Sequence, residues 1–144
     1  MGLDMYLTAE KRLHPRRDEE ESRAINALFP EVESSAIEVK FDIGYWRKAN
    51  HIHKWFVDNV QGGTDDQKEC FVSDSELKTL LDLCKKVSEN HDLAAELLPT
   101  TGGFFFGSTD YGDYYFEEIE KTIKIIEKAL ALNDDFYLKY SASW

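Results

Sequence analysis

Cysteine, basic residues and long hydrophobic runs are scarce in this sequence, and each scarcity excludes a class of protein. The two cysteines, Cys70 and Cys84, are too few for a disulfide framework in a chain of 144 residues, so we expect reduced thiols and a cytoplasmic location. No apolar run approaches the roughly 20 residues that cross a bilayer. Residues 1–7 also lack the basic and apolar regions of a signal peptide, so we expect no membrane partner.

The charge balance is strongly acidic. Lys and Arg number 17 against 28 Asp and Glu, which gives a formal net charge of -11. Nucleic-acid backbones are bound by clustered Lys and Arg, so direct binding of nucleic acid is not expected. The acidity is not uniform, because residues 40–56 carry Lys40, Arg47, Lys48 and Lys54 against Asp42 alone. The sequence therefore leaves room for a local cationic site in an acidic protein.

The chain has no internal repeat, low-complexity tract or flexible linker, so we expect residues 1–144 to form one domain. Apolar periodicity predicts strands at 3–8, 39–43 and 136–140, a minor strand at 70–72, and helices at 18–29, 45–60, 73–87, 92–98 and 113–132. Ser73 and Glu76 have capping-box spacing, and Cys84 lies in the apolar stripe of the helix that follows. The irregular order of elements predicts an α+β fold with a small, mainly antiparallel sheet. Both chain termini belong to this sheet, which packs against about four helices.

The predicted helix 45–60 is the first candidate site. At helical spacing Arg47, Asn50, His51 and Lys54 share one face, and such a face suits a phosphate or carboxylate. Tyr45 could add a flat stacking surface. The alternative is a solvated basic face on an amphipathic helix.

His53 lies on the apolar stripe of the same predicted helix. We interpret it as a hydrogen-bonded core histidine, with acid–base catalysis as the alternative. His51 and His53 are two positions apart on a helix and point in different directions, so one metal ion could not easily take both. We assign no metal ligand, no cofactor and no catalytic residue.

Two further segments suit recognition. In 99–109, glycines flank Phe104, Phe105 and Phe106, and Ser108 precedes a helix that could hold an anion at its N-terminus. The Gly-Lys-Ser/Thr of a P-loop is absent, and a buried aromatic plug is the alternative. In 110–118, Tyr111 and Tyr114 suit a recognition surface. The acidic residues there are explained by the dipole of a helix start.

Several motifs resemble a family of small, mostly uncharacterised phage and prophage proteins. The matching segments are Met1-Gly2-Leu3-Asp4-Met5-Tyr6-Leu7, Gly44-Tyr45-Trp46-Arg47-Lys48-Ala49-Asn50, Ile52-His53-Lys54-Trp55-Phe56-Val57, Gly103-Phe104-Phe105-Phe106-Gly107-Ser108 and Ala142-Ser143-Trp144. These segments are spread over nearly the whole sequence, and residues 13–38 are the part with the weakest resemblance. The resemblance implies synthesis in the cytoplasm of a bacterial host and a role in blunting host defence or redirecting host metabolism. It supplies no mechanism.

We expect the protein to act by binding rather than by catalysis. In the leading hypothesis, cationic and aromatic side chains gather in one pocket and hold a small anionic, nucleotide-like ligand. The residues assigned to this site are Tyr45, Arg47, Asn50, His53, Lys54, Phe105, Ser108, Tyr111 and Tyr114. The hypothesis requires that the helix 45–60 and the 103–115 segment converge.

Two alternatives stay open. The first is an acidic inhibitor that docks on the nucleic-acid surface of a host protein through Asp65, Asp66, Asp110, Asp113 and Glu117. The second is a hydrolase or transferase that uses His53 with a nearby carboxylate, although no nucleophile–base spacing is visible. The partner is thus a small anionic ligand or a host protein, and a homo-oligomer is compatible with either.

Overall fold

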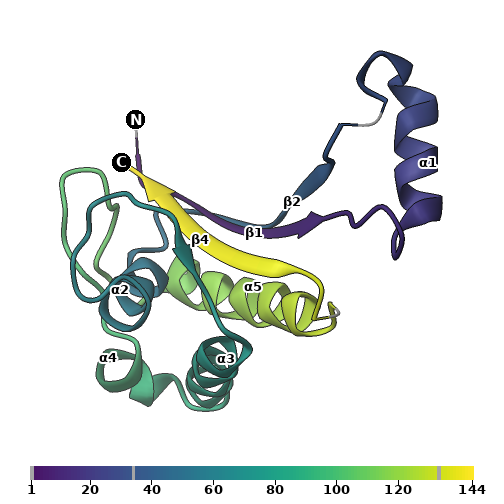
Figure 1. The fold of residues 1–144 in the computed structure, drawn as a ribbon. Coiled ribbons are helices and arrows are strands. Elements are labelled where there is room, and N and C mark those ends of the chain that lie inside the picture. The colour runs from purple at the N-terminus through teal and green to yellow at the C-terminus, as the bar shows by residue number, and fades with distance from the viewer. Residues whose placement is uncertain (1, 34, 133) are drawn as a thin grey trace.

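The computed structural model describes every residue except 1, 34 and 133 (Figure 1). In chain order the elements are β1 (Asp4–Arg12), α1 (Glu19–Leu28), η1 (Pro30–Val32), β2 (Glu38–Arg47), α2 (Asn50–Asn59), β3 (Cys70–Phe71), α3 (Asp74–Glu89), η2 (His91–Leu93), α4 (Ala94–Leu97), α5 (Asp113–Leu130) and β4 (Tyr137–Ser143). The expected α+β class is confirmed. No helix among the described residues is both long enough and apolar enough to cross a membrane.

The strands form one antiparallel sheet in the order β2-β1-β4-β3. The first strand therefore lies between β2 and the last strand, and Asp4 faces Arg47 on one side and Ser143 on the other. This confirms the expectation that both terminal segments belong to the sheet. The two ends of the chain lie close together in Figure 1.

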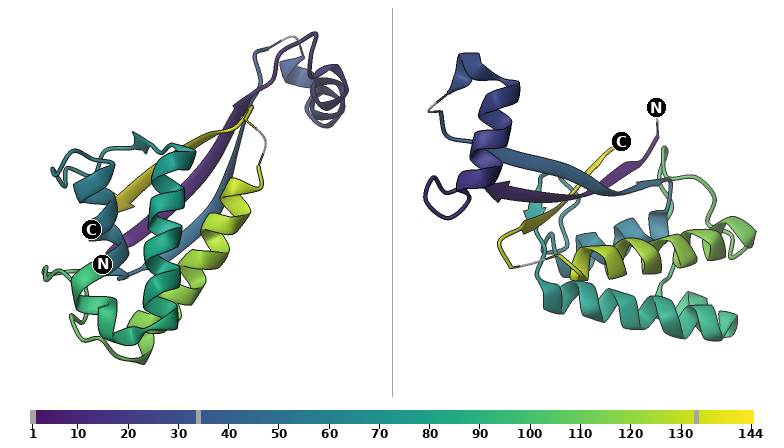
Figure 2. Two further views of the ribbon diagram at one scale, coloured as in Figure 1. Left: turned by 90° about the horizontal axis from the view of Figure 1, so that it is seen from below. Right: turned by 90° about the vertical axis from the view of Figure 1, so that its right-hand side faces the viewer.

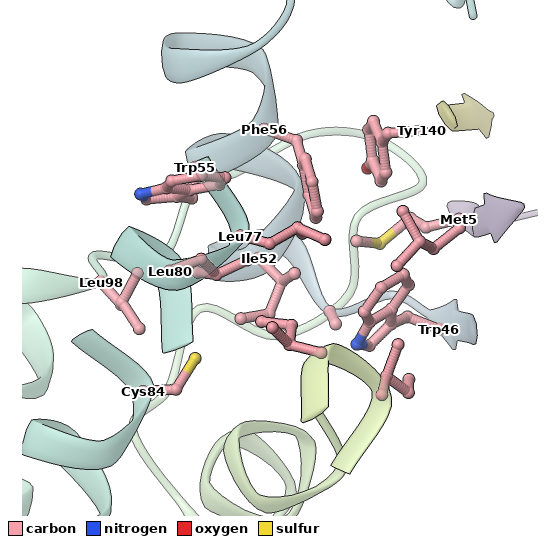
Figure 3. Close-up of a cluster of buried hydrophobic side chains, with 14 of the residues drawn as sticks. Met5, Trp46, Ile52, Trp55, Phe56, Leu77, Leu80, Cys84, Leu98 and Tyr140 are labelled. Carbon is pink, nitrogen blue, oxygen red and sulfur yellow. The ribbon is translucent and has the colours of Figure 1, made fainter. Parts of the chain in front are cut away.

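The core lies between the sheet and the helices α2, α3 and α5, which cover one face and leave the other open (Figure 2). Leu3, Met5 and Leu7 are completely buried because alternate residues of β1 point toward the helices. Figure 3 shows aromatic and aliphatic side chains filling this layer. Tyr140 of β4 stacks on Phe56 of α2 with 3.9 Å between ring centroids.

Cys84 lies in this core, as its place in an apolar stripe predicted, and burial raises the pKa of its thiol. The capping box is also confirmed at the start of α3. The Ser73 hydroxyl accepts from the Glu76 amide at 3.1 Å, and the Glu76 carboxylate accepts from the Ser73 amide at 2.8 Å.

The boundary between β2 and α2 differs from the prediction. The expected strand ended at Gly44 and the expected helix began at Tyr45, whereas β2 continues to Arg47 and α2 begins at Asn50. The register shifts between Leu7 and Thr8, and beyond this irregularity β2 still alternates between buried and exposed residues. Gly44 does not end the strand. It allows close approach of α5, because a Cβ there would lie 2.5 Å from Cγ2 of Ile125.

Beyond β1 the chain leaves the body as an arm, residues 13–33, which carries α1 away from the other helices (Figures 1 and 2). No residue of α1 is buried. The base of the arm is fastened by Asp18, whose carboxylate accepts from the His14 amide at 2.7 Å and pairs with Lys11 at 3.2 Å. The hydrogen bond from His14 is the main cause of the lowered pKa of Asp18, with Lys11 and Arg17 adding to it.

Candidate functional site

The buried side chain of Asn50 fastens the loop 99–112 to the start of α2. Its Nδ2 donates to the carbonyls of Phe106, at 2.9 Å, and Ser108, at 2.8 Å. Its Oδ1 accepts from the Thr101 amide at 3.0 Å. Asn50 begins α2, where its side chain is free to reach the loop instead of the helix backbone. The start of α2 therefore lies next to the glycine- and phenylalanine-rich segment, as the sequence predicted. The hydrogen bonds of Asn50 hold the two together.

Two further contacts fix the same loop. The Leu3 amide donates to the Phe105 carbonyl at 3.0 Å. Gly107 adopts a φ of 80°, and a Cβ there would lie 3.1 Å from Cβ of Lys48, so this turn requires glycine. The expected buried aromatic plug is only partly formed. Phe106 packs against His53 with ring centroids 5.4 Å apart, whereas Phe104 is 94% exposed.

A pocket of about 200 Å³, named here the α2–α5 pocket, opens where this loop meets α5. One wall comes from Lys48 and the start of α2, a second from the loop and a third from the first turn of α5. The lining residues are Lys48, Asn50, His51, Thr100, Ser108, Asp110, Gly112, Asp113, Tyr114 and Tyr115.

His51 is the most unusual group of the pocket. Its side chain is 3% exposed and its Nε2 has no hydrogen-bond partner among the described residues. The ring stacks on Tyr115 with 4.0 Å between centroids. Burial lowers the pKa of His51 to about 3, against a smaller opposing effect of a hydrogen bond to the Tyr115 backbone. A neutral imidazole with an unsatisfied ring nitrogen therefore lines the pocket at neutral pH.

The positive end of the α5 dipole also meets the pocket. Gly112 is the N-cap of this 18-residue helix and supplies no side-chain cap, so first-turn amides keep their capacity to donate. Lys48 has a left-handed φ of 56°, an uncommon conformation for a residue with a side chain, and it forms no ion pair with any described residue. Asp110 and Asp113 bring negative charge to the same lining.

The other residues assigned to a ligand site lie elsewhere. Because β2 extends to Arg47, this side chain does not share a helix face with Lys54, and the expectation of one cationic helix face is wrong. Arg47 Nη1 lies 3.3 Å from Asp4 Oδ1. The Tyr45 hydroxyl also donates to this oxygen, at 2.5 Å. Lys54 pairs with Asp58 at 2.6 Å, one turn along α2.

Two tyrosines of the 110–115 segment make hydrogen bonds, one within the loop 99–112 and one between α5 and β2. The Tyr111 hydroxyl accepts from the Thr100 amide at 3.2 Å. The Tyr114 hydroxyl donates to the Arg47 carbonyl, which ties the first turn of α5 to the end of β2. Tyr114 is also part of the pocket lining and remains half exposed. It is the aromatic surface that a ligand in the α2–α5 pocket would meet.

His53 is a core histidine with both ring nitrogens engaged, as we interpreted it. Nδ1 lies 2.6 Å from the Tyr140 hydroxyl and Nε2 lies 2.9 Å from Asp65 Oδ2, while the side chain is 1% exposed. Asp65 Oδ1 also accepts from Nε1 of Trp144 at 3.2 Å. The network joins α2, the 61–69 loop and β4. Neither Asp65 nor Tyr140 was identifiable from the sequence as a partner of His53, because they lie on separate segments.

The acidic residues assigned to a protein interface do not form one surface feature. Asp65 is engaged by His53 and Trp144, and Asp66 pairs with Lys68 at 2.9 Å. Asp110 and Asp113 line the α2–α5 pocket. Glu117 is exposed on the following turn of α5. Among the described residues there is no group of three or more His, Cys, Asp or Glu that could hold a metal ion.

Comparison of the chain with protein-family models, with curated proteins and with solved structures found no match in any of the three.

The burial of His51 predicts a loss of stability in mild acid. The folded-state pKa lies below that of the unfolded chain, so the unfolded chain takes up a proton that the folded protein does not. The free energy of unfolding that His51 contributes in this way is fully present above pH 6.5 and is lost as the pH falls toward 3. Between pH 7 and pH 5 the free energy of unfolding should fall by about 2 kcal/mol from this residue.

Urea unfolding at the two pH values, for the wild type and His51→Phe, measures this effect. Phenylalanine keeps a ring against Tyr115 and removes the titration, so the variant should lose less stability between pH 7 and pH 5 than the wild type. The same loss in both proteins would show that another group is responsible.

Proposed function

We propose that the protein is a non-enzymatic binding protein whose small anionic ligand occupies the α2–α5 pocket. The observation that carries this proposal is His51, a residue of the pocket lining whose buried Nε2 has no hydrogen-bond partner among the described residues. A buried polar atom without a hydrogen bond costs about 1–3 kcal/mol, so a ligand that bonds to it recovers free energy that the empty protein lacks. Lys48 and the uncapped start of α5 favour a negatively charged group beside it.

The volume and the charge of the pocket lining also limit the size and the chemistry of the ligand. A cavity of about 200 Å³ is smaller than the roughly 300–1,000 Å³ that holds a drug-sized molecule. It suits one phosphate or carboxylate group with a few neighbouring atoms. Asp110 and Asp113 repel further negative charge and accept hydrogen bonds, so the ligand should also present hydroxyl or amino groups. A nucleotide whose phosphate enters and whose base rests on Tyr114 meets these requirements.

Binding is favoured over catalysis because the histidine with a carboxylate partner is closed to a substrate. His53 is engaged at both ring nitrogens and is almost completely buried. Together with the resemblance of several sequence motifs to phage and prophage proteins, the pocket supports a role in the sequestration of a host metabolite or signal in the bacterial cytoplasm. Such a protein would lower the free concentration of its ligand and so modulate host defence or metabolism.

Calorimetric titration with inorganic phosphate, AMP and ADP tests the proposal. We expect measurable heat with at least one probe, and Lys48→Gln should weaken that binding by about tenfold, equivalent to about 1.4 kcal/mol. Lys54→Gln is the matched control, because Lys54 lies on α2 outside the pocket and pairs with Asp58. Flat heats for all three probes, or a loss caused by Lys54→Gln and not by Lys48→Gln, would contradict the proposed site.

A further inference from the structure

A second cavity adjoins the α2–α5 pocket at the first turn of α5. It has a volume of about 430 Å³ and is named here the His91 hollow, after the residue of η2 that forms part of its wall. Gly112 and Asp113 line both the pocket and the hollow, so the two meet at the start of α5. A ligand with one group in the pocket can therefore continue into the hollow.

Aromatic rings form the apolar part of the His91 hollow. The His91 ring stacks on Phe116 of α5 with 3.7 Å between centroids, and the two rings are almost parallel, at 9°. Tyr111 lines the same hollow and is 40% exposed. Exposed flat rings offer stacking surfaces to a planar group. The hollow therefore suits a planar ring of the ligand.

Carboxylates lie beside these rings. Asp113 and Glu117 line the hollow and form no ion pair with any described residue. Glu120 also lines it and accepts from the Ser88 hydroxyl. No lysine or arginine is among the described residues of this lining. Ionised carboxylates accept hydrogen bonds and do not donate them, so they favour a ring that carries an amino group.

The hollow and Tyr114 lie on different faces of α5. At 3.6 residues per turn, Phe116 and Glu117 share a face with Asp113, whereas Tyr114 lies on the next face, where its hydroxyl donates to the Arg47 carbonyl of β2. An anionic group at the start of α5 therefore has one aromatic surface on each side, Tyr114 on one and the His91 hollow on the other.

We propose, on the basis of the function proposed above for the α2–α5 pocket, that its ligand is a phosphodiester that joins two nucleosides. One base rests on Tyr114, and the other, which carries an amino group, occupies the His91 hollow. A phosphodiester has two substituents, one for each aromatic surface. It also carries a single negative charge, whereas a terminal phosphate carries about -1.5 to -2 at pH 7. The single charge reduces repulsion by Asp110 and Asp113 in the pocket lining.

Calorimetric titration with AMP and with the dinucleoside monophosphates ApA and UpU tests this proposal. ApA should bind about tenfold more tightly than AMP, because it adds a stacked base and carries less charge. ApA should also bind more tightly than UpU, whose bases carry no amino group. Glu117→Gln should weaken the binding of ApA by about fivefold without weakening that of AMP or UpU, because Glu117 lines the hollow and not the pocket.

Glu127→Gln is the matched control and should leave all three affinities unchanged. Glu127 lies on the same helix, pairs with Lys85 at 3.4 Å and belongs to neither lining. If AMP binds and ApA binds no more tightly, or if Glu117→Gln weakens ApA no more than Glu127→Gln does, the phosphodiester proposal is wrong and the proposed function of the pocket stands. If none of the three probes binds, the phosphodiester proposal is wrong, and the proposed function fails with it when inorganic phosphate and ADP also give no heat.

Discussion

Replacing Asn50 with alanine should lower the free energy of unfolding by about 4 kcal/mol, because three backbone groups of the loop 99–112 lose their partner. The Asn50 side chain is 1% exposed, so water cannot replace these hydrogen bonds without opening the loop. The change also removes a side chain that lines the α2–α5 pocket. Ligand binding should therefore be lost together with stability.

Urea unfolding of Asn50→Ala measures the change, with Asn59→Ala as control. Asn59 lies at the other end of α2 and makes one hydrogen bond, to the Trp55 carbonyl, from an exposed position. Loss of this hydrogen bond should lower the free energy of unfolding by less than about 1 kcal/mol. Hydrogen exchange of the Thr101 amide gives a local readout, since that amide should lose protection in Asn50→Ala alone. Equal destabilisation by the two changes would show that Asn50 does not fasten the loop.

His53→Ala should destabilise the fold to a similar extent, by about 3–4 kcal/mol. The change leaves the Tyr140 hydroxyl without its partner in the core and creates a cavity beside Phe106. It also releases Asp65, and with it one contact of the 61–69 loop. The same change should not alter the affinity for a ligand in the α2–α5 pocket at a temperature where the variant is folded, because His53 is not part of that lining.

Thermal unfolding of His53→Ala and Tyr140→Phe measures this network. Tyr140→Phe removes the hydroxyl and keeps the ring against Phe56. It should therefore lower the stability of the fold less than His53→Ala does. His91→Ala is the control, since His91 is exposed and stacks on Phe116 at the surface of α5. A His53→Ala protein as stable as the wild type would mean that His53 is not a structural residue, and its role as an acid–base group would then need to be tested.

Local signals in the sequence accounted for most of the fold. The alternation of Leu3, Met5 and Leu7 predicted β1, the apolar stripe of 113–132 predicted α5, and the capping box predicted the start of α3. Each of these signals lies within the segment that it describes. The sequence also predicted that both terminal segments belong to one sheet, but the order β2-β1-β4-β3 was known only from the structure.

The position of the site was harder to predict, because its parts come from separate segments. The continuation of β2 through Tyr45 and Trp46 depends on a shift of register against β1 and on the close approach of α5 at Gly44. Neither is visible in the residues 39–60 alone. The helix-face hypothesis therefore selected Arg47 and Lys54, while Lys48 was left out.

The sequence predicted that His51 and Asn50 share one helix face, but it did not predict that His51 is buried. Burial results from the ring of Tyr115, which is more than 60 residues away. One local signal was present. The start of the helix after Ser108 was expected from the sequence to be able to hold an anion, and Gly112 supplies no side-chain cap there.

The pairing of β1 with β4 has a consequence for synthesis on the ribosome. β1 leaves the exit tunnel before the other three strands of this sheet, yet one of its two neighbours, β4, leaves after all of them. Until that strand emerges, the nascent chain can form the β1–β2 hairpin and the helices but cannot close the sheet between β1 and β3. A high contact order of this kind slows folding and leaves apolar surface exposed during translation. Chaperone dependence should therefore be greatest just before β4 emerges from the ribosome.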